Sequence, residues 1–245
     1  MIGRLLDTGP GDGAWNMAVD EAMLEGLRLG LAPPTLRAYA WQRPTVSLGR
    51  AQLLDPDLEA ACASAGVAIV RRPTGGRAVL HTGDFTYAIT ATDLPAGVKA
   101  SYCHLAHGLT AGLAGLGVTT TLGEASRPGR SVACFASPTA ADLKAGAAKL
   151  LGSAQMRRAG AVLQHGTLYL ERPTALARQL FPDGEGDVAD LLGLLGRMPS
   201  WREVRDGLAQ GLGEALGLTW QPGPLTPWEA ERAAASRMDF ALKST

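Results

Sequence analysis

The sequence lacks the features that mark several classes of protein. No stretch reaches the roughly 18 consecutive apolar residues that a membrane-spanning helix needs, so we expect no membrane span. Neither sign of charge is in excess, because 23 Lys and Arg residues balance 23 Asp and Glu residues. This balance argues against a general affinity for nucleic acid or anionic membranes. The opening segment carries an early acid and no long apolar run, unlike a secretory signal.

Cysteine is also scarce. Three cysteines without a CxxC pair argue against a disulfide framework and suit a reducing cytoplasm. Cys62 lies among small apolar residues, so packing is its expected role. Cys103 has two histidines within its next four residues, which are too few ligands for zinc, and we expect no metal. Cys134 lies in an aperiodic stretch near Arg127 and Arg130, where it is either a structural thiol or a nucleophile whose pKa these cations would lower.

Nucleotide-binding motifs are missing too. The chain contains no GxxxxGK[ST] sequence. Two glycine-rich stretches, GLAGLG at 112–117 and GLGEALG at 211–217, lack the GxGxxG spacing and fall in helical patterns. Neither stretch therefore predicts a dinucleotide site.

The pattern that is present predicts an α+β fold. Hydrophobic residues make up 46% of the chain, enough for a sizeable core. Helical patterns cover residues 14–29, 56–65, 103–116, 174–181, 200–217 and 227–240, and strand patterns cover 35–41, 45–50, 67–72, 77–81, 84–90, 149–158 and 161–171. Several strands follow each other across short turns. We expect one domain over residues 1–245, with a mostly antiparallel sheet flanked by helices and a mostly helical part from about 173.

A glycine turn follows the buried strand at 67–72. In RRPTGGR, residues 71–77, two adjacent glycines allow the backbone to approach a ligand closely. Arg71, Arg72 and Arg77 flank the turn, where they could bind a carboxylate or a phosphate. The same letters also fit an ordinary hairpin turn with solvated arginines. Composition and spacing alone leave both interpretations open.

Four segments together resemble the lipoate-protein ligase and octanoyltransferase superfamily. They are NMAVDEAML, RAYAWQRPTVSLGRAQ, RRPTGGRAVLH and KLLGSAQMRRAGAVLQHGTLYL, in family order between residues 14 and 172. The resemblance implies the biotin-ligase and class II synthetase-like fold, with a site built from the two glycine-containing segments. It implies the following substrate-binding residues: Arg71, Arg72, Thr74, Gly75, Gly76, Arg77, His81, Gly152, Ser153, Ala154, Gln155, His165 and Gly166.

The resemblance also assigns two catalytic residues. Lys149, rather than Lys144, aligns with the family's lysine before GSAQ, where a fixed positive charge stabilises an oxyanion. The stretch ACFASPTAADL is similar to the cysteine-bearing loop of the octanoyltransferase branch, which implies that Cys134 becomes the acyl-enzyme. His81 and His165 could orient the site or accept the thiol proton, and the sequence does not choose between these roles.

The activity that the resemblance implies is octanoyl transfer from an acyl-carrier-protein thioester to a lysine of an apo lipoyl domain or of the glycine-cleavage H protein. This transfer needs no cofactor, and basic clusters such as Arg157 and Arg158 would dock the acidic partners.

Four alternatives are weighed beside this activity. An ATP- and magnesium-dependent lipoate-protein ligase is disfavoured by Cys134 and by a chain too short for the extra domain of many such ligases. Amidotransfer between lipoyl domains remains open. A non-catalytic lipoyl- or octanoyl-binding protein is disfavoured because a binder needs neither Cys134 nor Lys149. Biotin ligation is disfavoured because no GRGRxGR-like loop is present.

Overall fold

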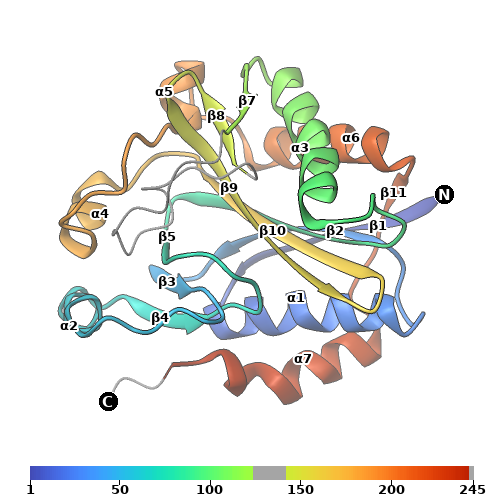
Figure 1. Cartoon of the computed structure of the whole chain (residues 1–245), viewed down its shortest axis with the longest axis horizontal. Coiled ribbons are helices and arrows are strands. Elements are labelled where there is room, and N and C mark those ends of the chain that lie inside the picture. The colour runs from blue at the N-terminus through green and yellow to red at the C-terminus, as the bar shows by residue number, and fades with distance from the viewer. Residues whose placement is uncertain (124–141, 243–245) are drawn as a thin grey trace.

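An eight-stranded mixed sheet forms the centre of the fold in this computed structural model, which describes residues 1–123 and 142–242 (Figure 1). Its strand order is β11-β1-β2-β6-β10-β9-β8-β7. The strands are β1 Ile2–Gly11, β2 Thr35–Trp41, β6 Asp84–Ala91, β7 Thr121–Leu122, β8 Leu143–Ala145, β9 Ala148–Arg158, β10 Ala161–Tyr169 and β11 Thr219–Pro222. Strand β1 pairs in parallel with β11 and β2, and all other neighbours are antiparallel. The α+β class with a mostly antiparallel sheet is confirmed.

A second sheet of three strands lies beside the first, in the order β4-β3-β5. It comprises β3 Thr45–Leu48, β4 Ala68–Arg71 and β5 Val79–His81. Strands that follow each other across a short turn do not pair with each other at three places. Strands β2 and β3, and likewise β5 and β6, belong to different sheets, and β4 and β5 lie on either side of β3. The chain crosses between the sheets at 42–44 and again at 82–83. Turn residues mark a change of direction in the sequence, but they do not say which strand becomes the neighbour.

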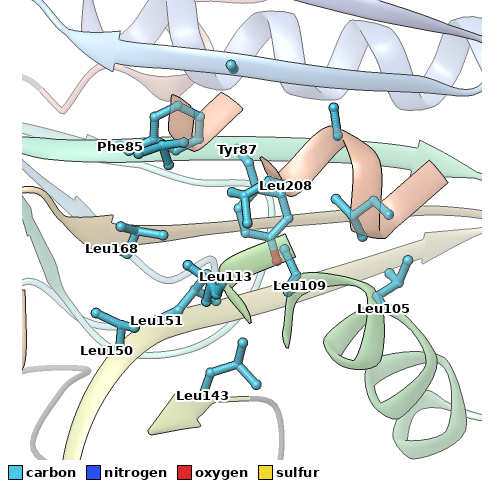
Figure 2. Close-up of a cluster of buried hydrophobic side chains, with 14 of the residues drawn as sticks. Phe85, Tyr87, Leu105, Leu109, Leu113, Leu143, Leu150, Leu151, Leu168 and Leu208 are labelled. Atoms are coloured by element: carbon cyan, nitrogen blue, oxygen red, sulfur yellow. The ribbon is translucent and has the colours of Figure 1, made fainter. Parts of the chain in front are cut away.

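Helix pairs cover both faces of the large sheet (Figure 1). On one face lie α1 Gly13–Arg28 and α7 Pro227–Phe240, and on the other lie α3 Val98–Gly115 and α6 Trp201–Leu216. Side chains alternate along β6, so Phe85 and Tyr87 pack toward α3 and α6 while Ala88 packs toward α1. Figure 2 shows the hydrophobic cluster between the sheet and the helices α3 and α6, in which Leu109 of α3 lies near Tyr87. The sheet is thus the middle layer of a three-layer core.

The helices α3 and α6 approach each other through glycines. A Cβ on Gly211 would lie 2.1 Å from the carbonyl oxygen of Gly108, and one on Gly112 would lie 2.5 Å from that of Gly207. These contacts leave no room for a side chain. The glycine-rich stretches that imitate nucleotide motifs therefore serve helix packing.

Three shorter helices complete the described part of the chain: α2 Pro56–Ala65, α4 Thr174–Leu180 and α5 Leu191–Leu195. The predicted helices at 14–29, 56–65, 174–181, 200–217 and 227–240 are confirmed to within a residue or two, and α3 begins five residues before its predicted start. Sequence patterns missed β1, β7, β8, β11 and α5. None of the helices described is both long and apolar enough to cross a bilayer.

Candidate active site

A small cavity lies between the two sheets, beside the glycine turn. It is lined by Met17, Tyr39, Trp41, Ser47, Arg72, Val79, His81, Thr86, Gly152, Ala154, His165, Gly166 and Thr167. Six of these, Arg72, His81, Gly152, Ala154, His165 and Gly166, were predicted as site residues. Segments far apart in the sequence therefore meet at this cavity, as the resemblance implied for the two glycine-containing segments.

The exposed wall of the cavity is largely apolar, although many of its residues are polar. The reason is that the polar atoms bond to one another. His81 Nδ1 lies 2.8 Å from Asp84 Oδ2, and its Nε2 lies 2.9 Å from Ser47 Oγ. The ring also stacks on Trp41 at 3.9 Å between centroids. Burial lowers the pKa of His81, although Asp84 opposes this shift, so the ring is neutral near pH 7.

His165 is held in the same manner on β10. Its Nδ1 lies 2.9 Å from Asp20 Oδ2, and its Nε2 lies 2.6 Å from Thr74 Oγ1. Asp20 comes from α1 and also accepts hydrogen bonds from Arg37, at 2.7 Å, and from the Tyr39 hydroxyl, at 2.9 Å. The cavity wall thus presents the carbon atoms of a hydrogen-bonded polar network.

The arginines of the glycine turn bond to backbone carbonyls. Arg72 donates to the carbonyls of Ser47 at 2.7 Å, Gly75 at 2.8 Å and Arg77 at 2.7 Å, which fixes the shape of the turn. Arg71 donates to the carbonyls of residues 49, 50 and 52. Binding of an anionic ligand by these two guanidinium groups stays a prediction, and their described contacts hold loops.

The glycines of this region permit close contacts between backbones. Gly76 has a φ of +95°, and a Cβ on Gly49 would lie 1.9 Å from the Gly76 carbonyl oxygen. The backbone N–H of Arg50 also donates to the carbonyl of Thr74 at 2.8 Å. The turn therefore packs closely against the preceding loop, and a side chain at Gly49 or Gly76 would prevent this contact.

Lys149 is buried at the start of β9. Its Nζ lies 3.0 Å from Asp142 Oδ2, and the two side chains are 1% and 2% exposed. A Cβ on Gly152 would lie 3.1 Å from Lys149 Cε and 3.3 Å from its Nζ. Because Gly152 lines the cavity, the ammonium group lies beside the cavity wall, on the side-chain face of Gly152. Lys144, the other candidate lysine, is its cross-strand partner on β8.

Two residues of the GSAQ segment make polar contacts away from this wall. The Ser153 hydroxyl lies 2.8 Å from the Tyr87 hydroxyl. Gln155 donates to Gln164 Oε1 at 2.8 Å and accepts from Ser101 at 3.0 Å. Tyr87 packs in the core cluster of Figure 2, and burial is the main cause that raises its pKa. A substrate contact for Ser153 or Gln155 stays a prediction.

Two groups of predicted residues need separate mention. Cys134, with Arg127 and Arg130, lies outside the described residues. Arg157 donates to the carbonyls of Pro95 and Gly97, and Arg158 pairs with Glu21 and Glu25, so this basic pair already has partners within the chain.

Sequence reasoning missed the buried acids Asp20 and Asp84, which orient both histidines. The available signal was an acid inside an apolar helix, in NMAVDEAML, and another three residues after His81. Within the ranges 1–123 and 142–242, no group of three or more Cys, His, Asp or Glu side chains has metal-binding geometry. The expectation of no metal stays a prediction.

Comparison with known proteins places the chain in a family. A profile of the lipoyl protein ligase A/B catalytic domain matches residues 12–212. Proteins named octanoyltransferase LipM are 41% identical in Symbiobacterium thermophilum, over 94% of this chain and 92% of theirs, and 37% identical in Moorella thermoacetica, over 97% and 95%. An octanoyltransferase is an acyltransferase.

Solved structures agree with the sequence match. A putative lipoate protein ligase from T. acidophilum with bound lipoic acid has a TM-score of 0.84 at 25% identity, over 98% of this chain and 96% of that one. A lipoate-protein ligase A bound with ATP also scores 0.84, at 26% identity, over 97% and 95%. The resemblance seen in the sequence is confirmed, and the chain belongs to the lipoyl protein ligase A/B catalytic domain family.

Proposed function

We propose that the chain is a protein N-octanoyltransferase of lipoate biosynthesis. It takes octanoyl from a carrier-protein thioester and delivers it to a lysine of a lipoyl domain through an acyl-enzyme on Cys134. The names of the relatives, at 37% and 41% identity, support the octanoyltransferase activity. The donor and the cysteine intermediate are the finer parts of the proposal.

The observation that carries the proposal is an apolar cavity with a buried ammonium group beside its wall. The wall suits an aliphatic acyl chain, because its polar atoms are already hydrogen-bonded and lose nothing when the chain displaces water. Lys149, beside Gly152, supplies a positive charge in a site of low dielectric constant. Charge stabilisation is strongest in such surroundings.

In the first step, the Cys134 thiolate attacks the carbonyl carbon of the octanoyl thioester. A new C–S bond forms, and the carbonyl electron pair moves to oxygen, which gives a tetrahedral oxyanion. Lys149 and backbone N–H groups near Gly75, Gly76 or Ser153 stabilise this oxyanion. The oxyanion collapses, the bond to the carrier's sulfur breaks, and the carrier leaves as a thiolate that takes up a proton.

In the second step, the neutral amine of an acceptor lysine attacks the acyl-enzyme carbonyl. The C–N bond forms, the C–S bond to Cys134 breaks, and the amine loses a proton. A thioester is converted to an amide, which is downhill, so neither ATP nor a metal ion is needed. The acceptor is a lipoyl domain or the glycine-cleavage H protein.

A donor comparison tests this proposal. An apo lipoyl domain is offered octanoyl-carrier protein in one reaction, and free lipoate with ATP and magnesium in another. We expect transfer only from octanoyl-carrier protein, its loss in Cys134→Ser, and its retention in Cys103→Ser, the matched change on α3. Transfer by Cys134→Ser at the wild-type rate would overturn the acyl-enzyme.

An ATP-dependent lipoate-protein ligase is the second candidate, favoured by the similarity to a ligase solved with ATP. In that case the 71–77 turn would bind the adenylate, and pyrophosphate would be released with lipoate. Acceptance of octanoyl from another lipoyl domain would instead indicate amidotransfer. Binding of octanoate without turnover on any donor would indicate a non-catalytic binding protein.

A further inference from the structure

Two chains of hydrogen bonds with the same order, Asp to His to hydroxyl, end on one short segment. This segment is the glycine turn, residues 71–77. One chain of hydrogen bonds starts from the carboxylate of Asp84, at the start of β6, and the other starts from the carboxylate of Asp20, on α1. Each passes through a histidine that is 5% exposed, His81 or His165.

The first chain reaches the turn through Arg72. Because a carboxylate only accepts hydrogen bonds, the proton of the neutral His81 ring lies on Nδ1, facing Asp84. Nε2 then accepts from the Ser47 hydroxyl at 2.9 Å. The Ser47 oxygen in turn accepts from Arg72 Nη1 at 3.2 Å. Since Arg72 also holds the carbonyls of Gly75 and Arg77, the chain fixes the far end of the turn.

The second chain reaches the turn directly. The Nδ1 atom of His165 faces Asp20, and Nε2 is hydrogen-bonded to the Thr74 hydroxyl at 2.6 Å. Asp20 itself is fixed by Arg37 and Tyr39. His165 lies on β10 of the large sheet, so this chain ties the near end of the turn to that sheet.

The same geometry argues against two catalytic roles. Both Nε2 atoms are already hydrogen-bonded to a hydroxyl, so neither ring offers a free lone pair to a thiol. Ser47 and Thr74 are each 1% exposed, so neither hydroxyl is presented as a nucleophile, despite the Asp-His-Ser order. Ser47 moreover lies inside β3, without the sharp turn that exposes a nucleophilic serine.

We propose that His81 and His165 are positioning residues, which pin the two ends of the glycine turn through the hydroxyls of Ser47 and Thr74. The turn thereby keeps its backbone in place beside the cavity without contributing a base. The claim about the turn stands on these contacts alone. Its consequence for octanoyl binding rests on the proposed function.

Amide hydrogen exchange on the full chain tests the claim about the turn. Thr74→Val keeps the size of the side chain and removes the hydroxyl, whereas Thr74→Ser keeps the hydroxyl. We expect the amides of residues 74–77 to exchange at least about tenfold faster in Thr74→Val, and within about threefold of wild type in Thr74→Ser. Ser47→Ala is expected to act on the same amides through Arg72. The amides of α6 serve as the reference for global stability.

Equal exchange in wild type, Thr74→Val and Ser47→Ala would overturn the proposal, as would a Thr74→Ser variant as fast as Thr74→Val. If Thr74→Val also accelerates exchange in α6, that variant has lost global stability, and the exchange of residues 74–77 in Ser47→Ala tests the proposal instead. These outcomes do not depend on whether the chain transfers octanoyl.

Kinetics test the consequence for the reaction. In His165→Asn we expect the KM for octanoyl-carrier protein to rise about tenfold, with kcat within about threefold and alkylation of Cys134 by iodoacetamide unchanged. His107→Asn, the same change at an exposed position of α3, is the control. Slower alkylation in His165→Asn would indicate a base and overturn the positioning role. Absence of transfer in the wild type would refute the proposed function. The exchange data would still test whether the two histidines position the glycine turn.

Discussion

Two buried cations of this protein, Arg37 and Lys149, have different surroundings. Arg37 donates to Asp20, to the carbonyl and side-chain oxygens of Asn16, and to the hydroxyl of Thr8, and it stacks over the ring of Tyr39. Lys149 pairs with Asp142, and its ammonium group lies beside a glycine of the cavity wall.

Under the proposed function, this difference separates a charge that holds the fold from a charge that acts in the reaction. A planar guanidinium with a partner at every nitrogen is locked, and it stabilises a fold only while all partners remain. A lysine is a compact charge on a flexible stem, which can follow a developing oxyanion through a small shift. The chain uses arginine where geometry must be fixed, and lysine beside the cavity.

The largest expected effect is on the rate of transfer. Lys149→Met removes the charge beside the cavity wall, and we expect octanoyl transfer to fall by about 100- to 1,000-fold, as for other oxyanion-stabilising groups. Lys144→Met, at the cross-strand partner on β8, is the matched control and should fall less than about threefold. The reverse ranking of the two variants would assign the catalytic charge to Lys144 and contradict the role proposed for Lys149. Melting temperatures measured alongside separate loss of chemistry from loss of fold.

The second effect is on stability. Arg37→Met leaves the Asp20 carboxylate buried without its cation, and both side chains are 0% exposed. We expect the free energy of unfolding to fall by about 3–5 kcal/mol. Arg158→Met, which breaks a partly exposed pair with Glu21 and Glu25, should cost less than about 1 kcal/mol. Urea denaturation measures both, and equal losses would contradict the distinction.

Sequence motifs pointed to Lys149 and to six of the thirteen residues that line the cavity, because these residues lie in local motifs around glycines. They missed the acids, since Asp20 meets His165 across 145 positions and Arg37 across 17. Such pairs arise only when α1 packs on the sheet. Strand β1 was missed because its glycines and proline resemble a loop, while pairing with β2 and β11 makes it a strand. The division of strands between two sheets depends on the same long-range packing.

A smaller effect should follow from moving the ammonium group rather than removing it. In Gly152→Ala the new Cβ would lie 3.1 Å from Lys149 Cε, so the side chain must shift by a few tenths of an ångström. We expect transfer to fall about tenfold while the melting temperature changes little. Gly115→Ala, which meets no atom within 4 Å, is the control. An unchanged rate in Gly152→Ala would show that the position of Lys149 is not critical.

The smallest effect concerns the pH dependence of stability and the buried carboxylate of Asp84, whose partner is the neutral His81. Burial lowers the pKa of His81, Arg72 and His165 add to this, and Asp84 opposes it. Between the folded and unfolded pKa values the unfolded chain therefore binds the extra proton, so stability falls as pH drops below about 6.5. Urea unfolding between about pH 5 and 8 should show this loss in wild type and less of it in His81→Gln. The same pH dependence in both proteins would contradict the assignment.

The most direct test of the central claim is the intact mass of the protein after mixing with octanoyl-carrier protein, without an acceptor. We expect one octanoyl group on the wild-type chain, located on Cys134 by peptide mapping, that leaves when an apo lipoyl domain is added. Cys134→Ala should acquire none. Octanoylation of the lipoyl domain by Cys134→Ala at the wild-type rate, or a wild-type chain that is never acylated while transfer proceeds, would contradict the account.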